Sequence, residues 1–189
     1  LGDDAALVSL GTDGAGAAEA AGAHGAARSF LAAGAGRAAG AEGLVSVLAE
    51  LAREQNARVV LFPADELGGE LAPRLAERLA GTAVTHAVAV EVAGERTVWT
   101  RPVFGGKALA RLTAAAEPVV ATLRRGAFEP AAPNGDAVAV ETRSIPPGDG
   151  AVELVGVEET AAGASLEEAA VIVAGGAGLG GPEAFAALE

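Results

Sequence analysis

A glycine-rich turn near the end of the chain has the residue types and spacing of a phosphate-binding loop. Gly176, Gly178 and Gly181 fit the pattern G-x-G-x-x-G between an apolar strand-like run, 170–174, and a segment that begins like a helix. Backbone N–H groups at such a turn can bind a pyrophosphate, because glycine lets the backbone approach the ligand closely. The alternative, which we favour, is that the glycines only allow tight packing of strand against helix.

Few other side chains are placed for chemistry. Asp65 and Glu66 form a carboxylate pair suited to acid–base work, although an aspartate just before a helical pattern is more typical of an N-cap. His86 lies in an apolar strand pattern and is expected to be structural. His24 lies in an Ala/Gly segment, where we expect it to be exposed and without the partners of a metal site. No Ser/His/Asp or Cys/His arrangement indicates a catalytic nucleophile.

Basic and aromatic residues in the second half of the chain are candidates for contact with another protein. Arg101, Arg124 and Arg125 could meet an acidic surface, or they could be solvated strand ends. Trp99 and Phe104 could pack on a partner or inside the core, because aromatic side chains contribute strongly to both. The sequence leaves these alternatives open.

Composition narrows the function classes. The net charge of -12 argues against nucleic acid or an anionic membrane surface as a partner. No apolar run reaches the roughly 18 residues that would predict membrane insertion. The absence of cysteine excludes disulfides and thiolate metal sites and fits a reducing compartment. The expected location is the bacterial cytoplasm. The chain also lacks methionine, so Leu1 is not an initiator residue and the chain is expected to be incomplete.

The first part of the chain alternates strand and helix patterns. Apolar runs and 3.6-residue periodicity predict, in order, strand 5–11, helix 14–26, strand 27–31, helix 41–56, strand 58–63 and helix 65–79. The inner stripe of the last helix is expected to consist of Leu67, Leu71, Leu75 and Leu79. This alternation predicts an α/β fold, a Rossmann-like three-layer arrangement around a parallel sheet.

After Gly81 the pattern becomes β-rich, as a hairpin extension. Strands are expected at 83–92, 97–104, 109–112 and 119–123, then an edge strand at 137–141 and a last strand at 152–157. Pro102 is tolerable if its strand lies at a sheet edge. We therefore expect one domain over 1–157, an acidic linker over 158–168, and the truncated start of a second α/β domain over 169–189.

Five segments together resemble the alpha subunit of electron transfer flavoproteins, also called the large or FixB-type subunit. They are residues 63–76, 85–91, 101–108, 119–128, and the Gly-Gly-x-Gly-Leu-Gly turn of 175–180 followed by Glu183 and Phe185. The resemblance runs from about residue 5 to 189. It implies that the first domain lacks its opening strand and helix. Two positions depart from the family: Ala177 replaces an arginine, and His86 replaces the usual aspartate.

The resemblance implies an electron carrier rather than an enzyme that converts a substrate. Such an alpha subunit forms a heterodimer with a beta subunit and carries FAD, held mostly by its second domain. It accepts electrons from flavoprotein dehydrogenases, such as the acyl-CoA dehydrogenases of fatty acid β-oxidation, and passes them to a membrane quinone oxidoreductase. Gly175, Gly176 and Gly178 are then the cofactor-binding candidates, and the main FAD contacts are expected beyond Glu189.

Two alternatives remain at this stage. The chain could be a non-redox nucleotide-binding module with an adenine nucleotide alpha hydrolase-like fold, which the α/β pattern and the glycine turn favour. It could also be a flavin-free scaffold fragment.

Overall fold

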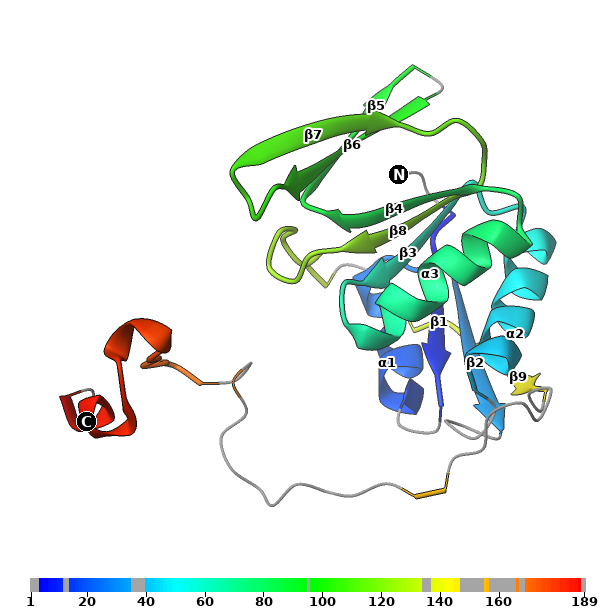
Figure 1. Ribbon diagram of the computed structural model, residues 1–189. Coiled ribbons are helices and arrows are strands. Elements are labelled where there is room, and N and C mark those ends of the chain that lie inside the picture. Colours follow the sequence, from blue (N-terminus) through cyan, green and yellow to red (C-terminus); the bar gives the residue numbers. More distant parts are fainter. Residues whose placement is uncertain are drawn as a thin grey trace. The chain divides into compact units, whose positions relative to one another are not determined.

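The structure is a computed structural model that describes residues 4–11, 14–34, 40–94, 96–133, 137–146, 155–156, 166 and 169–187. The chain divides into two compact units, residues 1–154 and 155–189. Each unit is considered by itself. All of the described α-helices and β-strands belong to the first unit (Figure 1).

The first unit alternates strands and helices and then continues mainly in strands. Its order is β1 Ala6–Leu10, α1 Ala15–Ala20, η2 (a 3-10 helix) Gly22–His24, β2 Arg28–Gly34, α2 Gly40–Glu54, β3 Val59–Pro63, α3 Glu66–Arg78, β4 Thr82–Ala87, β5 Ala89–Ala93, β6 Arg96–Val103, β7 Ala108–Thr113, β8 Val119–Leu123 and β9 Val140–Ile145. The mixed α/β class that the sequence predicted is confirmed.

The strands form three sheets of three strands each. Two are parallel, with the orders β1-β2-β9 and β3-β8-β4, and the third, β5-β6-β7, is antiparallel. The antiparallel sheet is the β-rich extension that the sequence indicated. It lies on the opposite side of β3, β8 and β4 from helices α2 and α3 (Figure 1).

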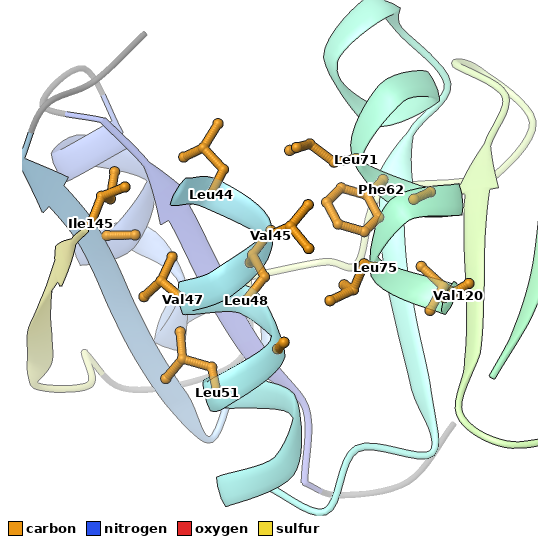
Figure 2. Packing of buried hydrophobic residues seen from close by; sticks show 14 of the residues in the cluster. Leu44, Val45, Val47, Leu48, Leu51, Phe62, Leu71, Leu75, Val120 and Ile145 are labelled. Atoms are coloured by element: carbon orange, nitrogen blue, oxygen red, sulfur yellow. The ribbon is translucent and has the colours of Figure 1, made fainter. Parts of the chain in front are cut away.

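Helices α2 and α3 pack against each other and against both parallel sheets. The apolar face of α2 is buried and meets the fully buried Leu71 and Leu75 of α3 (Figure 2). This face consists of Leu44, Val47, Leu48 and Leu51. Phe62 of β3, Val120 of β8 and Ile145 of β9 belong to the same cluster. One hydrophobic core therefore joins strands of both parallel sheets through the helical layer.

The predicted leucine stripe of α3 is confirmed in part. Leu71 and Leu75 are fully buried, whereas Leu67 is 45% exposed and Leu79 is only partly buried. The remaining buried positions are taken by small residues, and the full buried set of the helix is Gly68, Leu71, Ala72, Leu75 and Ala76. Glycine and alanine at these positions let the helix axis approach the sheet.

The segment predicted as one strand over 83–92 is two strands in two different sheets. β4 pairs in parallel with β8, and β5 pairs in antiparallel fashion with β6. The change occurs at His86, whose φ of 56° is left-handed, where the β4–β8 register shifts between Val84 and Ala87. The Oγ1 of Thr122 accepts a hydrogen bond from the His86 backbone N–H at 2.8 Å, which replaces the lost ladder contact.

The prediction that 119–123 continues a series of hairpins was wrong. β8 is the central strand of the parallel sheet β3-β8-β4, and its first four residues are buried. A run of apolar residues without polar alternation is typical of a parallel strand that is covered on both faces. That signal was present in Val119–Leu123, although the preceding hairpins obscured it.

Trp99 of β6 anchors the antiparallel sheet to the parallel one. Its side chain is fully buried and packs in a second cluster with Val84, Ala87, Val119 and Ala121. Its Nε1 donates a hydrogen bond to the Thr97 hydroxyl at 2.8 Å. Of the two alternatives for Trp99, core packing is therefore the one that the structure has.

Two further strand expectations need correction. β6 is the middle strand of its sheet, so Pro102 does not lie on an edge strand as expected. The pairing of β6 with β5 ends at Thr100, and Pro102 is paired only with β7. The proline therefore interrupts no hydrogen bond between β6 and β5. The edge strand predicted over 137–141 occupies Val140–Ile145 and pairs with β2. Of the strand predicted over 152–157, residues 155–156 are described without strand structure and the rest lie outside the described residues. The expected linker over 158–168 also lies outside the described residues, except at Leu166.

Gly68 offers a test of how closely α3 approaches β3. A Cβ at this position would overlap the carbonyl oxygen of Pro63, and the Gly68 N–H binds the Asp65 side chain. We expect Gly68→Ala to destabilise the fold by roughly 1–3 kcal/mol, because the backbone oxygen cannot move aside easily. Urea unfolding of the variant measures the change.

Gly69→Ala is the matched control, because Gly69 is exposed and a Cβ there would meet no atom within 4 Å. It should be neutral or stabilising by up to about 1 kcal/mol, as expected for alanine in place of glycine in a helix. Equal losses in the two variants would contradict the close approach of helix and strand.

Candidate functional site

The glycine turn in the second unit folds as two short 3-10 helices. Gly176 is the N-cap of η4 (Ala177–Leu179), and the turn leads into η5 (Pro182–Ala187). The Leu179 N–H donates to the Gly176 carbonyl at 2.9 Å, and Gly180 has a left-handed φ of 83°. The turn is therefore stabilised by its own backbone hydrogen bonds.

The strand and the α-helix expected on either side of this turn are not formed. Residues 171–176 have no described secondary structure, and Val171, Ile172 and Val173 are 80%, 55% and 64% exposed. The helix start at 182 is a 3-10 helix of six residues. A lone strand has no neighbour with which to pair, and one helical turn cannot persist without packing, so both expectations require a sheet that these residues do not contain.

The described turn offers backbone N–H groups but no cation to the phosphates of FAD. Residues 169–187 contain no lysine or arginine, and Glu183 is their one charged side chain. The N–H groups of Leu179 and Gly180 already bind carbonyls within the turn. A pyrophosphate needs free N–H groups or a nearby cation. The cofactor role of Gly175, Gly176 and Gly178 remains a prediction.

Asp65 is the N-cap of α3, as the capping interpretation predicted. Its Oδ1 accepts the Gly68 N–H at 2.7 Å, while Glu66 is exposed in the first helical turn. Both carboxylates lie at the positive end of the helix dipole. Their arrangement therefore serves the helix end and gives no sign of an acid–base pair.

The two histidines lie at the surface. The side chain of His86 is exposed, contrary to a structural role in an apolar strand, and only its backbone is structural. Histidine and aspartate tolerate a left-handed backbone better than most residues, which explains why either can stand there. His24 is exposed as expected, and its Nδ1 lies 3.1 Å from the Ala131 carbonyl oxygen. The described residues contain no group of three potential metal ligands.

Two shallow hollows occur in the first unit. One, of about 460 Å³, lies between the start of β6 and the segment before β8, and Arg96 and Glu117 line it. The other, of about 410 Å³, lies between β1 and α1 and is lined mainly by alanines, with His24 at its side. Neither brings together the residues of a catalytic site.

Glu117 forms the best-defined ion pair near the first hollow. Its carboxylate accepts two hydrogen bonds from Arg58, at 3.0 Å from Nε and 2.7 Å from Nη2. The Arg58 hydrogen bond is the main reason that the pKa of Glu117 lies below its ordinary value of 4.5; slight desolvation opposes this shift and the Arg58 charge adds to it. The pair joins the start of β3 to the segment before β8.

Five basic side chains make no hydrogen bond or ion pair with any described residue: Arg96, Arg101, Lys107, Arg124 and Arg125. The sequence analysis singled out three of them and missed Arg96 and Lys107. A running charge count would have found both, because residues 96–125 contain six basic residues and one acidic residue in a chain of net charge -12. Whether these residues meet an acidic surface remains a prediction.

Comparison with known proteins identifies the family. Residues 1–147 match the model of the electron transfer flavoprotein domain. The chain is 31% identical over 162 residues to the electron transfer flavoprotein subunit alpha of Bacillus subtilis, covering 79% of this chain and 46% of that protein. It is 33% identical over 147 residues to the subunit alpha of Syntrophomonas wolfei, covering 77% of this chain and 46% of that protein.

A third relative is the protein FixB of Clostridium saccharobutylicum, 30% identical over 155 residues, which cover 78% of this chain and 46% of that protein. The chain thus spans about half the length of the curated relatives that it matches. Among the described helices, none combines the length and the apolar content needed to cross a bilayer.

The Arg58–Glu117 pair predicts a defined pH dependence of stability. Because the pKa of Glu117 is lowered in the folded state, its contribution is present above the ordinary pKa and is lost as the pH falls through the folded pKa. Glu117→Gln should therefore unfold at lower urea concentration than the parent at neutral pH, and the difference should shrink as the pH falls below 4.5 and through the folded pKa of Glu117. A difference that persisted in acid would contradict the ion pair as its cause.

Proposed function

The chain belongs to the electron transfer flavoprotein domain family, and on that premise we propose that it is the first-domain region of an electron transfer flavoprotein alpha subunit. The observation that carries this proposal is the family match over residues 1–147, together with relatives that are named as alpha subunits or FixB. The complete protein then acts as an electron carrier. No described cluster of side chains supports a substrate-converting reaction in this region.

The partner in this proposal is an electron transfer flavoprotein beta subunit, with which the alpha subunit forms a heterodimer. The cofactor is FAD, held mainly by residues outside the part of the chain that the structure describes. The glycine turn has no lysine or arginine to meet the phosphates of FAD, which supports this division. Gly175, Gly176 and Gly178 then form a packing turn at the start of the flavin-binding domain.

The electron donors in this proposal are flavoprotein dehydrogenases, such as acyl-CoA dehydrogenases, and the acceptor is a membrane quinone oxidoreductase. The expected site of action is the bacterial cytoplasm. The resemblance to the family supports this route.

The domain boundaries are also a proposal. Among the strands that the structure describes, β1 pairs only with β2 and β3 pairs only with β8, so each has an open edge. The apolar residues of β3 are incompletely covered, with Leu61 41% exposed, whereas β8 in the same sheet is almost wholly buried. Parallel strands are normally covered on both faces and paired on both edges inside a sheet. We propose that a further strand, from outside the described residues, pairs with these edges and completes the domain.

Co-expression of the complete alpha subunit with the beta subunit of the same bacterium tests the function. We expect a 1:1 complex that contains FAD, detected by its absorbance after size-exclusion chromatography. A purified heterodimer without flavin would contradict the electron-carrier proposal. Calorimetric binding of ATP or AMP by the 189-residue chain alone would instead favour the nucleotide-binding module that the glycine spacing suggests.

Hydrogen exchange tests the open edges. In the complete subunit, amide protons of β1 and β3 should exchange more slowly than in the 189-residue chain, because the added strand protects them. The amides of β8, already paired on both sides, serve as the internal reference. Equal exchange of β1 and β3 in the two proteins would contradict a completing strand.

A further inference from the structure

Strand β9 is weakly attached to the rest of the first unit. It lies at the edge of its sheet and pairs, among the described strands, only with β2. Ile145 is the one buried residue of the six in β9, whereas four of the five residues of β8 are buried. An edge strand with little buried apolar surface opens at a lower free-energy cost than a central strand. The attachment of β9 therefore depends on a small number of contacts.

Arg143 provides the first of these contacts. Its guanidinium bridges two carboxylates, with Nη2 2.9 Å from Oε2 of Glu54 in α2 and Nη1 2.8 Å from Oε1 of Glu141 in β9. It also lies over the ring of the buried Phe30 in β2, 5.7 Å from the ring centroid. Ion pairs and cations over aromatic rings are both favourable, so this one side chain ties β9 to α2 and β2.

The same side chain carries a cost while β9 is attached. Nε of Arg143 is shielded from water and has no hydrogen-bond acceptor among the described residues. A shielded donor without an acceptor costs free energy, which is recovered when water reaches the N–H group. Release of β9 would hydrate this group. Arg143 thus holds β9 less firmly than its contacts alone would suggest.

The last residue of β9 is attached by a close backbone approach. Ile145 is 5% exposed, belongs to the core cluster of α2 and α3, and is paired with Gly34 of β2. A Cβ at Gly34 would lie 3.2 Å from the Ile145 backbone nitrogen, and Gly34 has a φ of 140°. Glycine at this position is therefore what allows β9 to close on the end of β2.

Strand β2 has other neighbours that remain when β9 is removed. It is paired along its opposite edge with β1. On one face, the Ser29 hydroxyl donates to the Ala18 carbonyl of α1 at 2.7 Å, and on the other face Phe30 packs in the core cluster with α2. Opening of β9 can therefore leave β2 and most of this core cluster in place.

We propose that β9 is a detachable strap, which opens as a unit and closes again while the rest of the first unit stays folded. It is the last described strand before the boundary between the two compact units, at residues 154 and 155. With β9 attached, the connection to the second unit starts after Ile145. With β9 released, that connection extends back toward the end of β8. The strap therefore sets the length of the connection, whatever reaction the complete protein serves.

Hydrogen exchange of the complete protein, resolved to single residues, tests the strap. The β9 amides bonded to β2 and the β2 amides bonded to β9 should share one opening constant, at least about a hundredfold larger than that of β8. Low urea should leave this constant unchanged, because local opening exposes little surface, whereas it should accelerate exchange of β8. Opening constants graded along β9 would indicate fraying, and a constant equal to that of β8 would indicate global unfolding; either result would overturn the strap.

Two variants separate release of the strap from a general loss of stability. Arg143→Gln removes the ion pair and the cation over Phe30, and it should raise the opening constant of β9 at least about threefold. Gly34→Ala should raise it at least about tenfold, because the added methyl group meets the Ile145 backbone and the φ of Gly34 is unfavourable for alanine. Exchange of β8 should stay within about twofold of the parent in both variants.

Arg74→Gln and Gly69→Ala are the matched controls. Arg74 forms an ion pair within α3, with Glu70 at 3.1 Å, and a Cβ at Gly69 would meet no atom within 4 Å. Both should leave the opening constant of β9 within about twofold of the parent value. The strap is wrong if Arg143→Gln and Gly34→Ala accelerate β8 as strongly as β9, or if they affect β9 no more than the controls do.

Discussion

The burial of strand β8 on both of its faces is the constraint on which the rest of the first unit depends. Val120 points into the core shared with α2 and α3, while Val119 and Ala121 pack beneath Trp99. Burying an apolar side chain of this size stabilises the fold by about 1.5–3 kcal/mol. Because β8 carries apolar side chains on both faces, each face must be covered by another layer of the fold. The helical layer on one side and the antiparallel sheet on the other provide those covers, so their positions follow from this strand.

The second cover of β8 is a sheet rather than a layer of helices. This sheet begins at the bend at His86 and continues as hairpins. Trp99 and the partly buried Val90 pack in the cluster that covers β8. Phe104 and most of β7 remain exposed. One part of the sheet therefore stabilises the core while another part stays at the surface.

Local patterns in the sequence predicted the helices and strands well where one physical cause dominates. The apolar periodicity of 41–56 specified α2, and the aspartate at 65 specified the start of α3, because capping and amphipathicity are local properties. The assignment of strands to sheets was less accessible. The only local feature that separates β4 from β5 is the left-handed backbone at His86. The central position of β8 depends on its pairing with β3, whose residues lie 55 or more positions earlier in the chain. The exposure of Leu67 likewise depends on how closely Gly68 lets α3 approach.

The charge distribution gives the candidate sites different physical roles. A domain that binds a dinucleotide places cations or free N–H groups at a glycine turn, and here the turn of 175–181 has neither lysine nor arginine. The cations without a described partner lie instead on separate elements: Arg96 and Arg101 in β6, Lys107 in the turn before β7, and Arg124 and Arg125 after β8. Cations that bind a phosphate group must converge on one point. Because these cations are spread over several elements, their spacing does not suit a small anionic ligand.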